Sequence, residues 1–252
     1  MKAIIIGATS GIGREVALKL LEEGWELGIA GRRTAELEAI KELYGVSRVK
    51  IAAIDVTSES ATGALDTLLE ETGAPDWFLH VSGVGYQSGP LDEEKELRTV
   101  MTNAVGSVRM ISHFLNYVKL NADVYKAPGR KKVRIGIVSS IAGTAGLGAA
   151  PAYSATKRMQ SHYISALSQF VRMEKMPVRF TDIRPGFVAT ALLSSEKKYP
   201  MLIKPEKAAK YIVRCLHCGP RVVTFDWRYR ALVFFWRLIP RPLWERLTWV
   251  NN

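Results

Sequence analysis

The sequence predicts an α/β fold in which one doubly wound parallel sheet is flanked by helices. Short runs rich in β-branched residues alternate with longer helical patterns to about residue 224, which is typical of parallel strands joined by helices. A strand, a glycine-rich turn and a helix open the chain in that order. A length of 252 residues with 48% hydrophobic content is compatible with one domain that buries a sizeable core.

The first segment supplies the strand, the turn and the helix. Lys2 to Ile6 read KAIII, a short apolar run that is typical of a buried parallel strand. The next residues, GATSGIG, place glycines at Gly7, Gly11 and Gly13, and apolar residues at helical spacing follow in REVALKLLEEG. Because the free N–H groups and the dipole at a helix N-terminus favour anions, this order predicts a site for a pyrophosphate. The glycines permit a close approach to the backbone, although a glycine-rich turn by itself could be only a turn.

A tyrosine, a lysine and a serine form the second informative group. Tyr153 and Lys157 stand four residues apart in YSATK, and Ser140 lies thirteen residues before the tyrosine (153 − 140 = 13). Positions i and i+4 share one face of a helix, so we expect the Lys157 ammonium close to the Tyr153 phenol. A phenol has a pKa of about 10, and a neighbouring cation lowers it toward the range useful for acid–base catalysis. Ser140 would then bind the substrate oxygen while Tyr153 gives or takes its proton. The alternative is a surface tyrosine and lysine on an ordinary helix.

These motifs, with others in the same order, resemble the short-chain dehydrogenase/reductase family over about Met1 to Thr224. GATSGIG is similar to the family's cofactor turn, and Asp55-Val56 to the acidic position that faces the adenine. TNAVG contains the active-site asparagine, Asn103, and RPGFVAT is similar to the segment beside the nicotinamide. The resemblance implies a single-domain Rossmann fold with about seven parallel strands. We therefore expect residues 1–224 to form the NAD(P)-binding domain, and residues 225–252 to form an extension packed on that domain or at an interface.

The resemblance also implies roles for individual residues. The catalytic tetrad would be Asn103, Ser140, Tyr153 and Lys157. The residues that contact the cofactor would be Gly7, Thr9, Ser10, Gly11, Ile12, Gly13, Arg32, Arg33, Asp55, Val56, Ser82, Gly83, Tyr153, Lys157, Pro185, Gly186, Val188 and Thr190. Lys157 would bind the nicotinamide ribose and lower the Tyr153 pKa, and Asn103 would anchor a water in a proton relay through Lys157 to solvent. Hydride would pass between the nicotinamide and a carbonyl carbon, which interconverts a ketone or aldehyde with an alcohol.

The end of the second expected strand, in ELGIAGRR, bears on the choice of cofactor. An acidic residue there would bind a ribose 2′-hydroxyl and favour NAD(H), but this chain has Gly31, Arg32 and Arg33. Guanidinium groups suit a 2′-phosphate, and Thr34 adds a hydroxyl. The alternative is that both arginines are solvated at the start of the following helix. The pattern favours NADP(H) over NAD(H), with Arg32 as the leading contact.

One motif departs from the family pattern. Where the family usually has Asn-Asn-Ala-Gly, this chain has His80, Val81, Ser82 and Gly83. The glycine is retained, so we expect the close approach to the cofactor to be retained as well. An imidazole can replace the first asparagine as a hydrogen-bonding group. We expect His80 to be a hydrogen-bonded structural histidine on a buried strand rather than a catalytic one.

Two further segments leave alternatives open. Cys215 and Cys218 form CLHC with His217 between them, but a structural zinc site needs a second ligand pair, so we expect reduced cysteines and no metal. The stretch from Ala191 to Pro205 stands where the family has a mobile substrate loop. Its apolar residues could form a lid over an apolar substrate or pack the loop onto the core: Leu192, Leu193, Tyr199, Met201 and Leu202.

The C-terminal tail reads FDWRYRALVFFWRLIPRPLWERLTWVNN from Phe225. It interleaves arginines with four of the six tryptophans: Trp227, Trp236, Trp244 and Trp249. Three interpretations remain: an interfacial segment on a membrane surface, an oligomer or lid element that buries its aromatic residues against protein, and a nucleic-acid-binding segment. The last would need a recognised module, which is absent, so we expect no nucleic-acid partner.

Charge and hydropathy narrow the expected partners and location. No segment has the roughly 20 apolar residues of a membrane span, and Met1 leads directly into the first strand, which leaves no room for a cleaved signal peptide. We expect a cytoplasmic homo-oligomer, a dimer or tetramer, with peripheral contact to the inner face of a membrane as an open alternative. A net charge of +11 favours acidic partners such as an acyl carrier protein, a CoA ester or anionic lipid.

Two classes of function follow from these observations. The first is an NADPH-dependent carbonyl reductase that acts on a small-molecule carbonyl or alcohol, with an apolar ketone or aldehyde as the expected substrate. The second is a catalytically idle protein that binds NADP(H) or contacts a membrane surface. The presence of both Tyr153 and Lys157 favours the enzyme.

Overall fold

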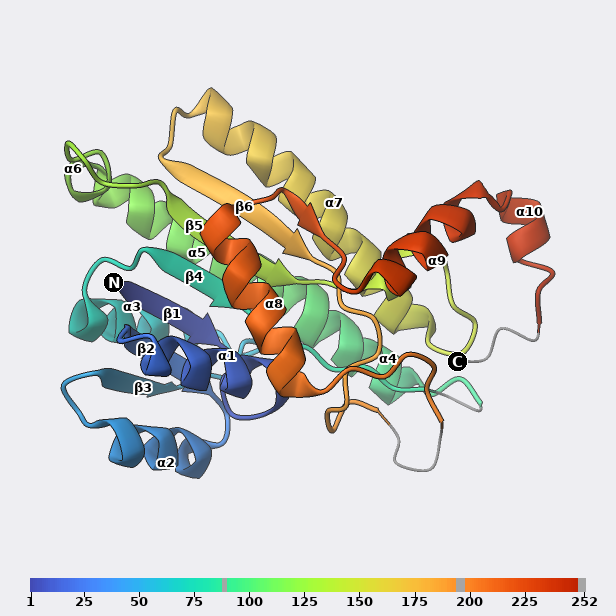
Figure 1. Cartoon of the computed structure of the whole chain (residues 1–252), viewed down its shortest axis with the longest axis horizontal. Coiled ribbons are helices and arrows are strands. Elements are labelled where there is room, and N and C mark those ends of the chain that lie inside the picture. The colour runs from blue at the N-terminus through green and yellow to red at the C-terminus, as the bar shows by residue number, and fades with distance from the viewer. Residues whose placement is uncertain (88–89, 194–197, 249–252) are drawn as a thin grey trace.

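Seven parallel strands form one sheet, and helices cover both of its faces (Figure 1). The computed structural model describes residues 1–87, 90–193 and 198–248. The strands stand in the order β3-β2-β1-β4-β5-β6-β7, which confirms the predicted doubly wound α/β fold. Their bounds are β1 (Lys2–Ile6), β2 (Glu26–Gly31), β3 (Val49–Ala53), β4 (Trp77–His80), β5 (Val133–Val138), β6 (Val178–Ile183) and β7 (Val222–Val223).

Helices alternate with the strands along the chain. Their bounds are α1 (Gly11–Glu22), α2 (Thr34–Tyr44), α3 (Ala61–Thr72), α4 (Glu93–Val100), α5 (Gly106–Leu120), α6 (Ala122–Tyr125), α7 (Pro151–Met173), α8 (Pro205–Cys218), α9 (Trp227–Leu238) and α10 (Arg241–Trp244). A π-helical turn, η1 (Met101–Val105), joins α4 to α5, and a 3-10 turn, η2 (Ile141–Thr144), follows β5. Within the described part of the chain, no helix is both long enough and apolar enough to cross a membrane.

Alternate residues of the first strand enter two different cores. Ala3 and Ile5 pack in the core shared with α1, α2 and α8, whereas Ile4 and Ile6 pack in the core shared with α3, α5 and α7. Successive side chains of a strand point to opposite faces of the sheet. The uninterrupted apolar run of β1 therefore fills both cores at once, as a strand covered on both faces requires.

The topology opens a crevice between β1 and β4. From β1 the chain adds β2 and β3 on one side and then crosses to β4 on the other. Ile6 pairs with Ala30 of β2 and with His80 of β4, so the loops after β1 and β4 begin side by side at this switch in direction. The carboxyl ends of strands at such a switch in direction are where open α/β sheets bind ligands.

The C-terminal residues fold into α9 and α10 beyond the carboxyl ends of the strands (Figure 1). Phe225, Tyr229 and Val233 are buried in the core shared with α1 and α8. The Trp244 indole donates to the Gly146 carbonyl at 2.6 Å, which joins α10 to the loop that follows η2. One tryptophan of the tail, Trp249, lies outside the described residues.

Candidate active site

A cavity of about 920 Å³ lies at the carboxyl ends of the strands, where the crevice opens. The glycine turn after β1, the ends of β2 and β4, η2, the start of α7 and the segment after β6 all contribute to its wall. Most of the residues predicted to contact cofactor line it. Gly13, also predicted to contact the cofactor, and the predicted catalytic residue Asn103 are not among the lining residues.

The glycine turn brings the N-terminus of α1 to this cavity. Gly7 and Gly11 have φ values of 99° and 53°, in the left-handed region that favours glycine. A Cβ at Gly13 would stand 2.0 Å from the Gly7 carbonyl oxygen, so any side chain there would force the turn apart. The turn thus brings its backbone and the N-terminus of α1 close to the cavity, which fits a pyrophosphate.

The two arginines after β2 also line the cavity, and Arg33 is tied to the glycine turn. Its Nη2 donates to Thr9 Oγ1 at 3.0 Å and to Ser10 Oγ at 2.6 Å. Arg32 lies near enough to Asp55 to act on its charge. Both cations therefore face the end of the cavity that the glycine turn forms.

Asp55 is held by a local turn after β3. Its Oδ1 accepts from Thr57 N at 3.0 Å and from Thr57 Oγ1 at 2.7 Å. Burial acts to raise the pKa of Asp55, but the Thr57 hydrogen bonds and Arg32 outweigh it, so the pKa lies below its ordinary value. Asp55 and the buried Val56 both line the cavity.

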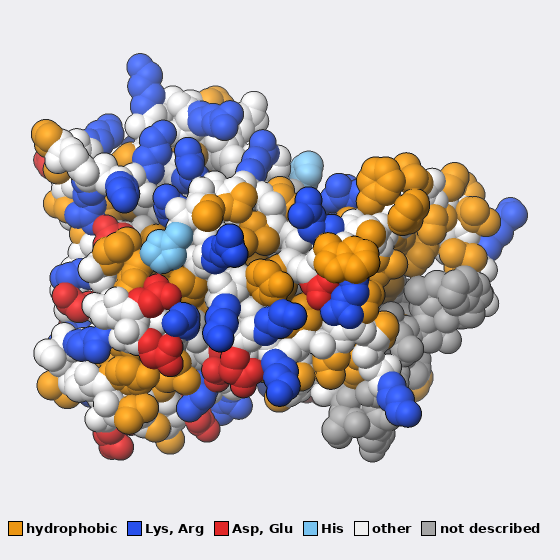
Figure 2. Space-filling model, in the orientation of Figure 1, with side chains coloured by type: hydrophobic (Ala, Val, Ile, Leu, Met, Phe, Trp, Pro, Cys, Tyr) orange, Lys and Arg blue, Asp and Glu red, His pale blue; other side chains and the backbone are white. Residues whose placement is uncertain are grey.

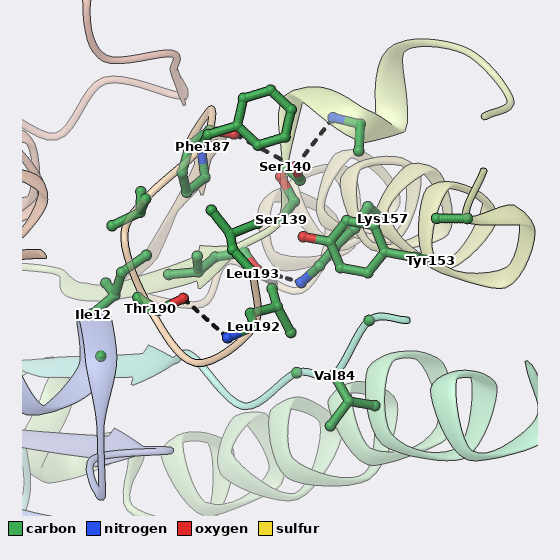
Figure 3. Close-up of a pocket in the computed structure, with 18 of the residues that line it drawn as sticks. Ile12, Val84, Ser139, Ser140, Tyr153, Lys157, Phe187, Thr190, Leu192 and Leu193 are labelled. Atoms are coloured by element: carbon green, nitrogen blue, oxygen red, sulfur yellow. Dashed lines mark hydrogen bonds between the residues drawn. The ribbon is translucent and has the colours of Figure 1, made fainter. Parts of the chain in front are cut away.

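Tyr153 and Lys157 lie on one face of α7, as predicted, and their side chains extend toward the loop that carries Leu192 and Leu193 (Figure 3). The Lys157 Nζ is 5.7 Å from the centroid of the Tyr153 ring. It donates to the Val138 carbonyl at 2.9 Å. Burial lowers the pKa of Lys157 to about 8, and Asp182 opposes that shift.

The expected fall in the Tyr153 pKa is wrong for this structure. Burial raises the pKa of the phenol, and a hydrogen bond with Ser140 opposes that rise only in part. Burial disfavours the charged phenolate, and the Lys157 ammonium is directed to the Val138 carbonyl instead of the hydroxyl. Tyr153 therefore holds its proton at neutral pH.

Ser140 lies where β5 ends, at the start of η2. Its Oγ accepts from Ala142 N at 3.1 Å and lies 3.5 Å from the Pro185 carbonyl, so the hydroxyl is fixed between two loops. Gly83 lies on the opposite side: a Cβ there would stand 3.2 Å from Asn103 Oδ1 and 3.3 Å from Lys157 Nζ. The preceding residue, Ser82, crowds Gly7 across the sheet, since a Cβ at Gly7 would be 2.7 Å from Ser82 N.

Asn103 belongs to the π-helical turn and is fully buried. Its side chain accepts from Val84 N at 2.8 Å and donates to Val84 O at 2.7 Å and to Thr156 Oγ1 at 3.1 Å. Its own carbonyl accepts from Ser107 Oγ and from Gln160 Nε2. Protein groups therefore bond to both the side chain and the carbonyl of Asn103, and the water relay through this residue stays a prediction.

His80 is buried at the end of β4, and the expectation of a hydrogen-bonded structural histidine is half right. Its Nε2 lies 3.1 Å from Ser107 Oγ, whereas Nδ1 has no partner among the described residues. Burial, and then the charge of Lys157, lower the pKa of His80 to about 3. His80 is therefore neutral at physiological pH, where the second nitrogen remains without a hydrogen bond.

A residue that the sequence did not single out, Tyr229 of α9, joins the tail to the predicted nicotinamide segment. Its hydroxyl accepts from Phe187 N at 3.0 Å and lies 3.0 Å from Pro200 O and 3.1 Å from Met201 O. A Cβ at Gly186 would stand 2.2 Å from the Tyr229 ring, so the ring lies directly on the glycine. The aromatic composition of the tail was the only available signal.

Residues of the expected substrate loop divide between the two alternatives. Leu192 and Leu193 line the cavity, as a lid would. Tyr199 packs on Phe187 with ring centroids 4.9 Å apart, and Met201 packs against the core. Leu202 is exposed, and residues 194–197 of the loop lie outside the described residues.

The rest of the segment after β6 is held by backbone contacts. Val188 forms an isolated parallel bridge with Ile203, and Thr190 lies beside Gly11, where a Cβ would be 3.0 Å from Thr190 Cγ2.

Cys215 and Cys218 on α8 are both free thiols. Over the described ranges of the chain, no three His, Cys, Asp or Glu side chains are grouped as metal ligands would be.

Comparisons with known proteins agree with this architecture. A family model for short chain dehydrogenase matches residues 1–200. An oxidoreductase of Myxococcus xanthus is 29% identical over 249 residues, which cover 96% of this chain and 94% of that protein. Glycine betaine reductase ATRR of Emericella nidulans is 31% identical over 237 residues, or 85% of this chain but only 17% of that longer protein.

Solved structures share the fold. An alcohol dehydrogenase from the archaeon Thermococcus sibiricus, complexed with 5-hydroxy-NADP, superposes with a TM-score of 0.73 at 25% identity and covers 89% of this chain and 95% of its own. ElxO with NADP bound superposes with a TM-score of 0.76 at 20% identity, over 91% of this chain and 98% of its own.

Proposed function

Because this chain belongs to the short-chain dehydrogenase family and is an oxidoreductase, we propose that it interconverts an apolar carbonyl compound and its alcohol with NADP(H). The main support is one observation: Ser140, Tyr153 and Lys157 line the same cavity as the glycine turn. A bound NADPH would supply the hydride. The chain's own residues would bind the cofactor, orient the substrate and protonate the carbonyl oxygen.

The residues that would hold the cofactor fit its chemistry. The turn from Gly7 to Gly13 is so tight that a side chain at Gly13 would collide with the Gly7 carbonyl. A tight glycine turn at a helix N-terminus suits a pyrophosphate. Arg32 and Arg33 suit a 2′-phosphate, and the contact of Arg33 with Thr9 and Ser10 already places positive charge beside the turn. The NADP-bound neighbours named above support the same choice.

Tyr153 can supply the proton that a reduction needs. Its phenol is protonated at neutral pH, and burial raises its pKa further, so it can donate to a carbonyl oxygen as that oxygen gains charge. The Ser140 Oγ accepts from Ala142 N and donates only a long hydrogen bond, 3.5 Å, to Pro185 O, so its hydrogen can turn to the same substrate oxygen. The Lys157 ammonium nearby stabilises the phenolate that remains.

The remainder of the cavity wall favours an apolar substrate. Side chains without a polar group, or with only an indole N–H, contribute to it from three separate segments: Leu147, Leu192, Leu193, Phe235, Trp236 and Trp244. Pockets of this kind bind apolar groups and use few polar atoms to set orientation. A ketone or aldehyde with an alkyl or aryl substituent would place its carbonyl at Ser140 and its substituent along this wall.

Arg32→Asp tests the cofactor. We expect the Kd for NADPH to rise about 100-fold and that for NADH to change less than threefold, because the new carboxylate repels a 2′-phosphate but not a 2′-hydroxyl. Titration followed by nicotinamide fluorescence measures both constants. Arg172→Asp, an exposed arginine at the end of α7, is the matched control. Equal losses of affinity for NADPH and NADH would contradict the proposed contact with the 2′-phosphate. If the wild-type protein oxidises no NADPH in the presence of decanal or cyclohexanone, the proposed carbonyl reduction is rejected.

The outer side of α9 supports a second proposal, contact with an anionic lipid surface. Trp227, Phe234 and Leu238 form one stripe at positions i, i+7 and i+11, and they are 75%, 61% and 64% exposed. The opposite side of the helix is buried at Tyr229 and Val233. Exposed arginines lie next to the stripe at positions 230 and 237, and Figure 2 shows hydrophobic side chains gathered over this helix with basic ones at their margin. Aromatic residues flanked by arginine are typical of helices that lie in the lipid interface.

Sedimentation with vesicles tests this contact. We expect the protein to bind vesicles of phosphatidylcholine with phosphatidylserine and to bind vesicles of phosphatidylcholine alone more weakly. The double variant Trp227→Ser, Phe234→Ser should lose at least tenfold in vesicle affinity, because each substitution removes apolar side-chain area that the lipid would bury. Leu43→Ser, an exposed leucine on α2, is the control. Binding that is unchanged in the double variant contradicts the proposal. A dimer that dissociates in that variant would assign the stripe to a second copy of the chain.

A further inference from the structure

A polar side chain that belongs to no recognised motif lies behind Lys157. Gln160 is three residues further along α7 and is 1% exposed. Its Oε1 accepts from Lys157 Nζ at 3.1 Å. Its Nε2 donates to Asn103 O at 2.8 Å and to Ser107 Oγ at 2.7 Å. One amide thus joins the ammonium on α7 to the π-helical turn and to α5.

The partners of this amide fix its orientation. Ser107 Oγ donates to Asn103 O, so His80 must donate from Nε2 to Ser107 Oγ. That tautomer leaves the unpartnered Nδ1 of the neutral imidazole as a bare acceptor. The Asn103 carbonyl can only accept, and Ser107 Oγ has already used its hydrogen. The amide nitrogen of Gln160 must therefore face them, and its oxygen must face Lys157.

Lys157 needs this acceptor because no free carboxylate among the described residues faces it. The charged group on the neighbouring strand, Asp182, is engaged by the Ser139 hydroxyl and by Arg184, whose Nε lies 2.7 Å from Asp182 Oδ2. On α7 the neighbouring titratable group is the protonated Tyr153, and on β4 it is the neutral His80. A buried ammonium without hydrogen bonds is costly, so Val138 O and Gln160 Oε1 are the two acceptors that keep it charged.

We propose that Gln160 is the positioning residue for Lys157: it holds the ammonium beside Tyr153 and favours its charged form. The role in catalysis rests on the proposed reaction, but the contact does not.

A titration of Lys157 in the full chain, without cofactor or substrate, tests the contact directly. The signal is the ¹³Cε resonance of labelled lysine, assigned by its loss in Lys157→Met. In Gln160→Leu we expect the midpoint to fall by more than one pH unit, because the ammonium loses an acceptor. In Gln160→Glu we expect it to rise, because a carboxylate replaces the amide. The exposed Gln169→Leu on the same helix should leave it unchanged.

Kinetics then test the consequence for the reaction. Gln160→Leu should lower kcat about tenfold or more with little change in the KM for substrate, and the alkaline limb of the kcat/KM profile should move to lower pH with the Lys157 midpoint. If Gln160→Leu does not fold, the rise in Gln160→Glu remains as the test. A Lys157 midpoint that is the same in every folded variant overturns the proposal, whatever the turnover. If the Lys157 midpoint shifts but the wild-type protein reduces no carbonyl, the proposed function is rejected and the role of Gln160 in positioning Lys157 is retained.

Discussion

Tyr153→Phe should lower kcat by about 10²- to 10⁴-fold and leave the Kd for NADPH within about twofold, because it removes the proton donor, with its hydrogen bond to Ser140, and keeps the ring. The phenyl ring would stay in place, since the Tyr153 ring already packs on Gly85, where a Cβ would stand only 2.5 Å from it. Lys157 keeps its bonds to Val138 and Gln160 in this variant. Steady-state NADPH oxidation and fluorescence titration on the same preparation measure the two constants.

The matched control is Tyr163→Phe, on the same helix. Its hydroxyl bonds to Ser112 Oγ at 2.9 Å, away from the cavity, so both constants should stay close to those of the wild type. Undiminished turnover by Tyr153→Phe would show that another group donates the proton. A wild-type protein that binds NADPH but reduces none of the carbonyls tried would favour the catalytically idle alternative.

Tyr229→Ala should lower the free energy of unfolding by about 3–5 kcal/mol and remove most of the activity, since it empties a buried aromatic site. The ring covers Gly186, and its hydroxyl holds Phe187, Pro200 and Met201. Without it, the segment beside the proposed nicotinamide site loses its fixed position. Denaturant unfolding and NADPH-dependent turnover measure the two effects.

Two other variants separate the contributions to this effect. Tyr229→Phe keeps the ring and should cost about 1 kcal/mol, because only the hydrogen bonds are lost. Trp227→Ala, two residues away and mostly exposed, should change stability by less than about 0.5 kcal/mol. A Tyr229→Ala protein as stable and as active as the wild type would show that the tail does not support the site.

The parts of the fold and the site that could be predicted from sequence are those that depend on residues close together in the chain. The run KAIII, the glycines after it and the four-residue interval from Tyr153 to Lys157 each depend on neighbours a few residues apart. Their strand, turn and helix were therefore predictable, and the order of such units fixed the fold class. The structure agrees at β1, at the turn and on α7.

What could not be predicted depends on partners far apart in the chain. Gln160 follows Lys157 by three residues, but its other partners are Asn103 and Ser107, more than fifty residues away. Tyr229 stands forty-two residues after Phe187, whose N–H binds its hydroxyl, and no spacing rule covers such a separation. The sign of the Tyr153 pKa shift was wrong for a related reason: the helix placed the cation nearby, but tertiary burial set the larger effect.

The contacts of Tyr229 have a consequence for exchanging parts between relatives of this protein. The tail, residues 200–201 and the backbone at Gly186 and Phe187 meet at a single phenol, so they form one module although they are separate in sequence. A loop grafted from a relative without the matching tail would not be shaped to place its backbone carbonyls where Pro200 and Met201 place theirs, beside this phenol. Transplants of specificity into this scaffold should therefore move the loop and the C-terminal helix together.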